Sequence, residues 1–321
     1  MLPEGRVLLI ANPAAQIGNG REAAEKALGL LSDRLGAGRV ELALTQQRGH
    51  AVEMAESAEG FSTVIGLGGD GLMHEVANGL MRRAPEDRPV FGVLPVGSGN
   101  DYAKSLSMSA HLASAVAELA EHPVLATDVG LCNGEHFLET LSFGVDVAIA
   151  LGTEERRVRT GRTGTRLYLE EGLDQVVRHR VERAFRLEMD GGCRVEYRRR
   201  AIASEGERVR SAEGALLLMA VQVGPTYGGG FRIAPGARLD DGVLDLCIAN
   251  APLGPVRAAY IFLRAKDGNH TGFSQVDFYR ARSLRVEFDE EPPAQIDGER
   301  ITGTSFDVEV IPRALRVIRK Q

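Results

Sequence analysis

The chain has 321 residues, of which 44% are hydrophobic and 26% are charged, and its formal net charge is −6. A chain of this length is expected to form one large domain or, more comfortably, two, with enough apolar residues for ordinary cores. The acidic balance argues against a nucleic-acid-binding protein, because affinity for a phosphate backbone comes mainly from a surplus of lysine and arginine.

Neither a membrane span nor a cysteine-based site is predicted. The sequence has no run of about 18 or more apolar residues, and its beginning, MLPEGRVLLIANP, lacks the basic region and cleavage site of a secretory signal. The three cysteines, Cys132, Cys193 and Cys247, are far apart and form no C-x-x-C pair, so we expect buried fillers. A cytoplasmic protein without a transmembrane segment is the expectation.

The N-terminal part alternates short apolar runs with segments of helical periodicity. Four such strand-and-helix units predict an open, mostly parallel sheet covered by helices, with ligands at the carboxyl ends of the strands. The expected strands are 6–12, 40–47, 62–69 and 89–96, and the expected helices are 20–35, 49–60, 71–83 and 100–121.

The rhythm changes near Leu131 to short β-type runs separated by Gly, Asp-Gly and Pro, which is typical of an antiparallel sandwich or barrel. A second, β-rich domain is therefore predicted. Its expected strands are 136–150, 183–191, 193–201, 214–224, 242–250 and 283–290, with helices at 165–182 and 254–268 and a mobile polar hairpin loop at 197–214.

The stretch VIGLGGDGLMHEVANGL, 64–80, contains two glycine signatures. Its spacing fits the G-x-G-x-x-G loop of a dinucleotide fold, but the next strand carries no acidic residue at its tip to hold a ribose. Asp70 would also repel a pyrophosphate unless Mg²⁺ intervened, which favours a nucleoside triphosphate. The alternative reading, Gly68-Gly69-Asp70-Gly71 as the phosphate loop of a kinase, fits better.

A second glycine-rich turn, PVGSGND at 95–101, follows the next strand. Glycines let the backbone approach phosphate oxygens, and helices beginning at Leu72 and Asp101 would point N–H groups at an anion. Two such loops at successive strand ends predict a site for a triphosphate chain.

These residues resemble the diacylglycerol kinase catalytic-domain family of lipid kinases, which is related to sphingosine kinases. The resemblance covers nearly the whole chain. It rests on Asn12-Pro13, on Thr45 before RGHA, on both glycine loops, and on the segments TDVG at 127–130, YGGGFRIAPGARLDDGVLDL at 227–246 and QIDGE at 295–299.

The resemblance implies a fold like that of NAD kinase and diacylglycerol kinase. An α/β nucleotide-binding domain with an open, mostly parallel sheet would span residues 1–130, and a returning C-terminal segment, 304–321, would complete it. A β-sandwich domain for the lipid substrate would span residues 131–303.

The resemblance also implies an ATP- and Mg²⁺-dependent kinase that acts on a hydroxyl of a lipid such as diacylglycerol. Glu299 matches the proton acceptor, with Asp297 and Asp70 as further catalytic carboxylates. A structural Mg²⁺ would be held by the Asp241 carboxylate and the carbonyls of Arg238 and Val243. The matching ATP contacts are Asn12, Pro13, Ala14, Ala15, Gln16, Thr45, Gly68, Gly69, Asp70, Gly71, Leu72, Met73, His74 and Ser98.

Several positions depart from the family pattern. Leu72 replaces the usual threonine, Ala14-Ala15 replace Ser-Gly, and Glu139 stands where asparagine is common. His74 is expected beside a phosphate or at the surface. The basic run at 154–166 is read as a solvated face, with lipid headgroups as the alternative.

Two other functions stay open. One is an NAD kinase-like enzyme acting on a soluble metabolite, and the other is a nucleotide-binding regulator that has lost turnover. The partners expected are a lipid at the membrane surface, met by transient peripheral contact, and no nucleic acid; a homodimer is also open.

Overall fold

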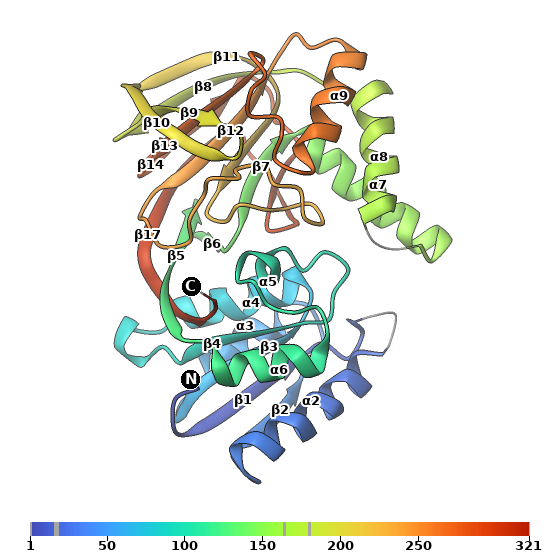
Figure 1. Ribbon diagram of the computed structural model, residues 1–321, viewed down its shortest axis with the longest axis vertical. Coiled ribbons are helices and arrows are strands. Elements are labelled where there is room, and N and C mark those ends of the chain that lie inside the picture. The colour runs from blue at the N-terminus through green and yellow to red at the C-terminus, as the bar shows by residue number, and fades with distance from the viewer. Residues whose placement is uncertain (1, 16–18, 163–164, 179–180, 321) are drawn as a thin grey trace. The chain divides into compact units, whose positions relative to one another are not determined.

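The computed structural model describes residues 2–15, 19–162, 165–178 and 181–320 (Figure 1). The chain forms two compact units: unit 1 is Met1–Val129 with Pro312–Gln321, and unit 2 is Gly130–Ile311. The C-terminal segment re-enters unit 1 at Pro312 and not at 304, because residues 305–309 are still paired with an antiparallel neighbour in unit 2.

Unit 1 contains the parallel sheet that the alternating pattern predicts. One register row runs through Leu42, Leu9, Ile65 and Gly92, which gives the strand order β2-β1-β3-β4. The strands are almost continuous apolar runs because helices cover both faces. They are β1 (Arg6–Ala11), β2 (Val40–Leu44), β3 (Phe61–Gly68) and β4 (Val90–Pro95).

Two helical layers flank this sheet, one with α2 (Gly20–Leu35) and α6 (Leu112–Glu121), the other with α3 (His50–Glu56) and α4 (Asp70–Met81) (Figure 1). Helix α4 begins at Asp70, before the expected range of 71–83. The helix expected at 100–121 is two helices, because Ser107 has φ +59° after α5 (Asp101–Ser105). A short 3₁₀ turn, η1, spans Pro85–Asp87.

Unit 2 is built from antiparallel strands, as the Gly- and Pro-punctuated runs predict. The central strand β11 pairs with β8 through its first half and with β7 and β12 through its second half. Strand β5 (Val124–Cys132) leads from unit 1 into unit 2. It is followed by β6 (Glu135–Phe137), β7 (Thr140–Gly144), β8 (Arg183–Asp190), β9 (Cys193–Arg198) and β10 (Ala201–Arg208). They are followed by β11 (Ser211–Gln222), β12 (Leu244–Asn250), β13 (Val276–Ala281), β14 (Ser283–Phe288), β15 (Ala294–Ile296), β16 (Glu299–Ile301) and β17 (Ser305–Ile318).

The polar segment 197–214 is not the loop that its composition predicts. It forms β10 and the start of β11, whose backbones pair with β9 and β8, while most of its side chains face solvent. Backbone pairing does not depend on apolar side chains, so an exposed ladder can be polar throughout.

The expectation of a strand over 136–150 is wrong beyond Gly144. That glycine has φ +109° and ends β7, and α7 (Val145–Thr160) follows directly. The alternation VDVAIA imitates a strand, yet Val147 and Ile149 are both buried within a helix. Helices α8 (Thr165–Arg178) and α9 (Pro255–Ala265) occur where they were predicted, and the three helices lie side by side in unit 2 (Figure 1).

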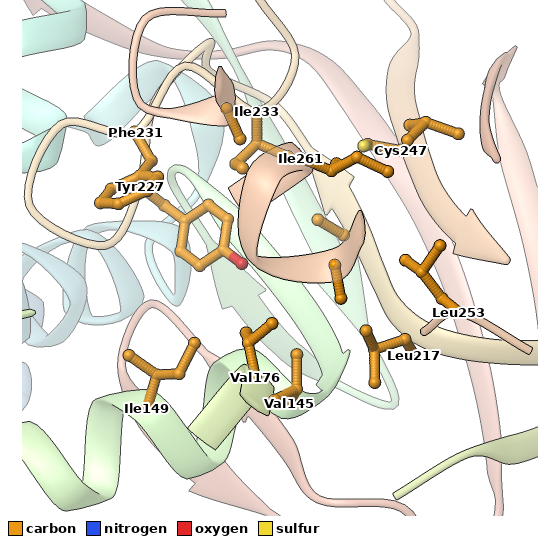
Figure 2. Packing of buried hydrophobic residues seen from close by; sticks show 14 of the residues in the cluster. Val145, Ile149, Val176, Leu217, Tyr227, Phe231, Ile233, Cys247, Leu253 and Ile261 are labelled. Atoms are coloured by element: carbon orange, nitrogen blue, oxygen red, sulfur yellow. The ribbon is translucent and has the colours of Figure 1, made fainter. Parts of the chain in front are cut away.

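The core of unit 2 joins these helices to the strands. Figure 2 shows Tyr227 and Phe231 of the glycine-rich loop in one cluster with Ile149 of α7, Val176 of α8 and Ile261 of α9. Among the cysteines, Cys132 and Cys247 are buried and Cys193 is half-buried, and each carries a free thiol. None of the helices in the described ranges combines the length and apolarity needed to cross a bilayer.

Candidate active site

The predicted nucleotide loops come together at one edge of the unit 1 sheet. Ala11 lies opposite Leu44 on one side and Leu67 on the other, and Gly68 lies opposite Pro95. The residues after these strand ends include Asn12, Thr45, Gly69 and Ser98, so loops far apart in sequence share the carboxyl edge of adjacent parallel strands. Gln16 lies outside the described residues.

The two glycine turns pack directly on each other. The Val96 N–H donates to the Gly68 carbonyl at 2.9 Å, and a Cβ placed on Gly97 would overlap the Cα of Gly69. Asn100, at φ +54°, brackets Gly97 by accepting from its N–H and donating to its carbonyl, both at 2.8 Å. This contact leaves no room for a side chain and keeps the loop backbone bare.

Helix α4 starts inside the first glycine turn. Gly69 is extended, and its carbonyl accepts from the N–H groups of Leu72 and Met73 at 3.1 and 3.2 Å. The Leu72 side chain covers Gly68, where a Cβ would be 2.7 Å from Leu72 Cδ2. The usual threonine position is therefore used here for packing, and the helix N-terminus at Asp70 faces the carboxyl edge of the sheet.

Met73 and His74 also point into the fold. Met73 Sδ would be 2.8 Å from a Cβ on Gly66, and His74 is only 6% exposed, with Nε2 3.3 Å from Asn78 Nδ2. A surface position for His74, one of the two alternatives expected, is thus wrong, because this side of α4 packs inward.

Two carboxylates converge beside the second glycine turn. A Cβ on Gly99 would be 2.7 Å from Asp70 Oδ2 and 3.5 Å from Asp101 Oδ2. Asp70 Oδ1 accepts from the Tyr102 N–H at 3.2 Å, and Asp101 Oδ1 is paired with Lys104 at 3.2 Å. Asp101 is not among the candidate site residues predicted from the sequence, although the GND sequence places it next to the turn.

The remaining loops at this edge are held by hydrogen bonds that their backbone N–H groups donate. Asn12 Oδ1 accepts from the Ala14 N–H at 2.9 Å, and the Asn12 carbonyl accepts from Ala15 at 3.1 Å. The Thr45 N–H donates to the Ala11 carbonyl at 2.9 Å, and Thr45 is 8% exposed. Rigid loops of this kind lower the ordering cost of binding.

In unit 2, Glu299 follows a two-residue hairpin turn. Asp297 and Gly298 have φ of +45° and +92°, as a type I′ turn requires, and Glu299 lies opposite Ile296. The Asp297 carboxylate accepts from three backbone N–H groups, those of Leu138 at 2.8 Å and of Glu139 and Thr140 at 3.0 Å. This engagement makes Asp297 the anchor of the turn that presents Glu299.

A row of buried polar side chains continues from this turn. Gln222 donates to Thr140 Oγ1 at 2.5 Å, and Gln295 donates to Ser142 Oγ at 2.9 Å. Burial raises the pKa of the Asp146 carboxyl, opposed by hydrogen bonds that include those from Ser142, Tyr227 and Gln295.

Glu139 contacts Asp297 through its backbone N–H, which donates to Asp297 Oδ1 at 3.0 Å, and it is 4% exposed. Its carboxylate covers Gly224, where any Cβ would collide with it, and its backbone carbonyl accepts from the Val223 N–H at 2.9 Å. The sequence marked Glu139 only as a departure from the family pattern; the fold places a buried acidic group beside the anchor of Glu299.

In the predicted structural metal loop, the Asp241 carboxylate forms an ion pair with Arg280. Asp241 Oδ2 accepts from Arg280 Nη2 at 2.6 Å, and the same guanidinium donates to Asp245 Oδ1 at 3.0 Å. A Mg²⁺ ion at Asp241 would have to compete with this guanidinium. Within the described ranges, no group of three or more His, Cys, Asp or Glu side chains has the arrangement of a metal site, so Arg238, Asp241 and Val243 remain a prediction.

Comparison with known protein families matches both units. Residues 6–132 match the diacylglycerol kinase catalytic domain, and residues 139–319 match the YegS C-terminal NAD kinase beta sandwich-like domain. The second match agrees with the sandwich expected for unit 2, and the first with the α/β fold of unit 1.

Curated relatives carry lipid kinase names. The chain is 29% identical over 321 residues to a "Probable lipid kinase YegS-like" protein of Pseudomonas aeruginosa strain UCBPP-PA14, covering 98% of this chain and 95% of the relative. It is 26% identical to a diacylglycerol kinase of Staphylococcus carnosus, covering 79% and 76%. A crystal structure of a diacylglycerol kinase from Bacillus anthracis has the same fold, with a TM-score of 0.71, 22% identity and coverage of 98% and 97%.

Proposed function

The chain belongs to the lipid kinase family that joins a diacylglycerol kinase catalytic domain to a YegS C-terminal domain, and we propose that it transfers the γ-phosphate of ATP, with Mg²⁺, to a hydroxyl of a lipid such as diacylglycerol. The observation that carries this proposal is the contact between the two glycine turns, Gly69 against Gly97, with the carboxylates of Asp70 and Asp101 beside it. Bare backbone next to oxygen ligands suits a phosphate chain with its cation.

In unit 1, the proposal assigns the phosphates to the glycine turns and to the N-terminus of α4, where backbone N–H groups point toward the carboxyl edge of the sheet. Asp70 and Asp101 would hold Mg²⁺ directly or through water, because a hard cation prefers carboxylate oxygens. When bound, Mg²⁺ neutralises charge on the phosphates. Asn12 and Thr45 shape the neighbouring loops; Leu72, Met73 and His74 contribute packing.

In unit 2, the proposal assigns the acceptor proton to Glu299. An alcohol has a pKa far above neutral, so a carboxylate can take its proton only as the oxygen bonds to phosphorus. Asp297 is a positioning residue here, because its carboxylate already accepts three N–H groups.

The test is transfer of labelled γ-phosphate from Mg·ATP to a panel of detergent-dispersed lipids, with NAD as a soluble acceptor. Glu299→Gln should lower kcat by about 10²–10⁴-fold, while ATP affinity and the melting temperature stay those of the wild type. Asp241→Asn, measured in the same assay over a Mg²⁺ titration, tests the predicted structural metal.

The alternatives give different results in this assay. Labelling of NAD alone would mean that the acceptor is a soluble metabolite and not a lipid. ATP binding without any labelled product would favour a nucleotide-binding regulator. Equal kcat for the wild type and Glu299→Gln would reject Glu299 as the proton acceptor even if a lipid is labelled.

A further inference from the structure

The most exposed apolar side chains of unit 2 gather on its three helices. Among the described residues, six large hydrophobic side chains are strongly exposed, and all six lie on α7, on α9, or on α8 and the segment just after it. They are Leu151, Val177, Val181, Val256, Tyr260 and Leu263. In the described part of unit 1, no large apolar side chain is exposed to this degree.

Helix α9 is apolar on two opposite faces. Ala258, Ile261 and Ala265 are buried, Ile261 is directed into the core (Figure 2), and the Phe262 ring lies so close to Gly172 of α8 that a Cβ there would overlap it. An apolar face of a helix ordinarily packs against the protein, yet one apolar face of α9 remains in solvent.

That outer face is a continuous stripe of three residues, Val256, Tyr260 and Leu263, which we call the α9 stripe. Their spacing of four and three places them on one side of the helix, and they are 83%, 50% and 45% exposed. Tyr260 packs edge-on against the Phe273 ring at 5.6 Å. The stripe is therefore held in place rather than folded back onto the core.

The charged residues within α9 are positive, and the exposed Asp267 follows just after the helix. Arg257 and Arg264, seven residues apart, lie along the same flank of α9, and the helix carries no acidic residue. Arg257 is fixed above the Phe273 ring at 4.7 Å and donates to Gln275 at 3.2 Å. In a chain of net charge −6, this face combines exposed apolar groups with a local excess of cations.

We propose that the α9 stripe, with Arg257 and Arg264, is the surface through which this protein docks on an anionic lipid bilayer. The apolar side chains would enter the interface between headgroups and acyl chains, and the arginines would contact anionic headgroups. A two-fold contact of this face with a second copy would bring the arginines of both copies together, whereas an anionic bilayer offers headgroups of opposite charge. The inference rests on the proposed function, because only a lipid acceptor requires the enzyme to work at a membrane.

The experiment measures sedimentation with vesicles in the absence of ATP. Vesicles of phosphatidylcholine mixed with phosphatidylglycerol are compared with phosphatidylcholine alone. The triple variant Val256→Ser, Tyr260→Ser, Leu263→Ser should lower vesicle affinity about 100-fold. Arg257→Gln with Arg264→Gln should lower it about tenfold on the anionic vesicles, with a smaller effect at high salt.

The matched control removes two exposed cations from a helix of unit 1, Lys26→Gln with Arg34→Gln on α2, and should leave vesicle affinity unchanged. The control should melt like the wild type. The melting temperatures of the other variants are measured beside it, because Tyr260 and Arg257 each contact the Phe273 ring. The proposal is overturned if the wild-type protein does not bind the vesicles, or if the triple variant binds them as tightly as the wild type. So does self-association that the triple variant abolishes without any vesicle binding.

Activity separates this inference from the proposed function. With a short-chain, water-soluble diacylglycerol the triple variant should match the wild type, whereas with a vesicle-embedded diacylglycerol its rate should fall in parallel with its vesicle affinity. Absence of any lipid phosphorylation would reject the proposed function, and the sedimentation result would still decide whether the stripe binds a bilayer. Equal rates for both proteins on vesicle-embedded substrate would overturn the docking role alone.

Discussion

Unit 1 gathers its candidate residues by placing loops after adjacent parallel strands, whereas unit 2 joins residues that are far apart along the chain. The glycine turns at 68–71 and 97–99 need only the pairing of β3 with β4 to meet. Asp297 accepts from N–H groups that lie 157 to 159 positions earlier. The arrangement in unit 1 depends on small residues, and the arrangement in unit 2 depends on a charged side chain. Different substitutions should therefore disrupt them.

The two units also differ in what they bury. The buried polar side chains of unit 2 include Asp146, Gln222, Gln295 and His270, and hydrogen bonds link them to neighbouring groups. The unit 1 turns depend on the absence of side chains at Gly69 and Gly97. Buried polar networks specify one arrangement but are costly when a partner is lost.

The largest structural effect is expected at Asp297. Asp297→Ala leaves three backbone N–H groups without their acceptor and should destabilise the protein by about 3–5 kcal/mol. Asp297→Asn keeps one carbonyl oxygen, so its stability should lie between that of Asp297→Ala and that of the wild type. Urea unfolding of both, beside Glu299→Gln, measures this; a Glu299→Gln loss as large as that of Asp297→Ala would contradict the anchoring role.

The next effect depends on pH and belongs to unit 2. Burial lowers the pKa of His270 to about 4, opposed by a hydrogen bond to the Ile233 carbonyl. As the pH falls, the unfolded chain binds this proton before the folded protein does. The free energy of unfolding should therefore fall by about 3 kcal/mol between about pH 6.5 and about pH 4. Subtracting His270→Gln stability from wild-type stability at each pH isolates it; a flat difference would reject it.

In unit 1 the corresponding weak point is the contact of the two turns. A Cβ at Gly97 meets the Gly69 backbone, which cannot move away as a flexible side chain could. Gly97→Ala should therefore cost about 1–3 kcal/mol and weaken ATP binding, because both turns must shift. Calorimetric titration with ATP checks the second part, and wild-type affinity in this variant would show that the turns do not hold the nucleotide.

The smallest effects compare two helical glycines. Gly79 lets α4 approach α3 so closely that a Cβ would overlap the Val52 carbonyl and lie 2.7 Å from Ala55 Cβ, whereas Gly29 of α2 has open space. Gly79→Ala should destabilise by about 1–2 kcal/mol, and Gly29→Ala should stabilise by about 0.5–1 kcal/mol. Thermal unfolding of the pair gives the signs; a stabilising Gly79→Ala would mean that α3 moves freely away from α4.

Much of unit 1 could be predicted from sequence because its signals are local. Apolar runs and helical periodicity located β1 to β4 and α2 to α4 closely, and the glycine motifs marked the strand ends. The prediction of a strand over 136–150 failed where a local pattern conflicts with its context. The segment VDVAIA alternates like a strand, but the positive φ of Gly144 ends β7 and the segment begins α7.

Local pattern by itself therefore determined the alternating α/β architecture, the β-rich second part and the loops that a phosphate would need. Only the tertiary structure decided that Asp297 anchors three distant N–H groups, that Arg280 pairs with Asp241, and that one apolar face of α9 stays in solvent. The physical reason is range: periodicity and turn propensity act over a few residues, whereas hydrogen-bond partners and burial depend on segments brought together by folding.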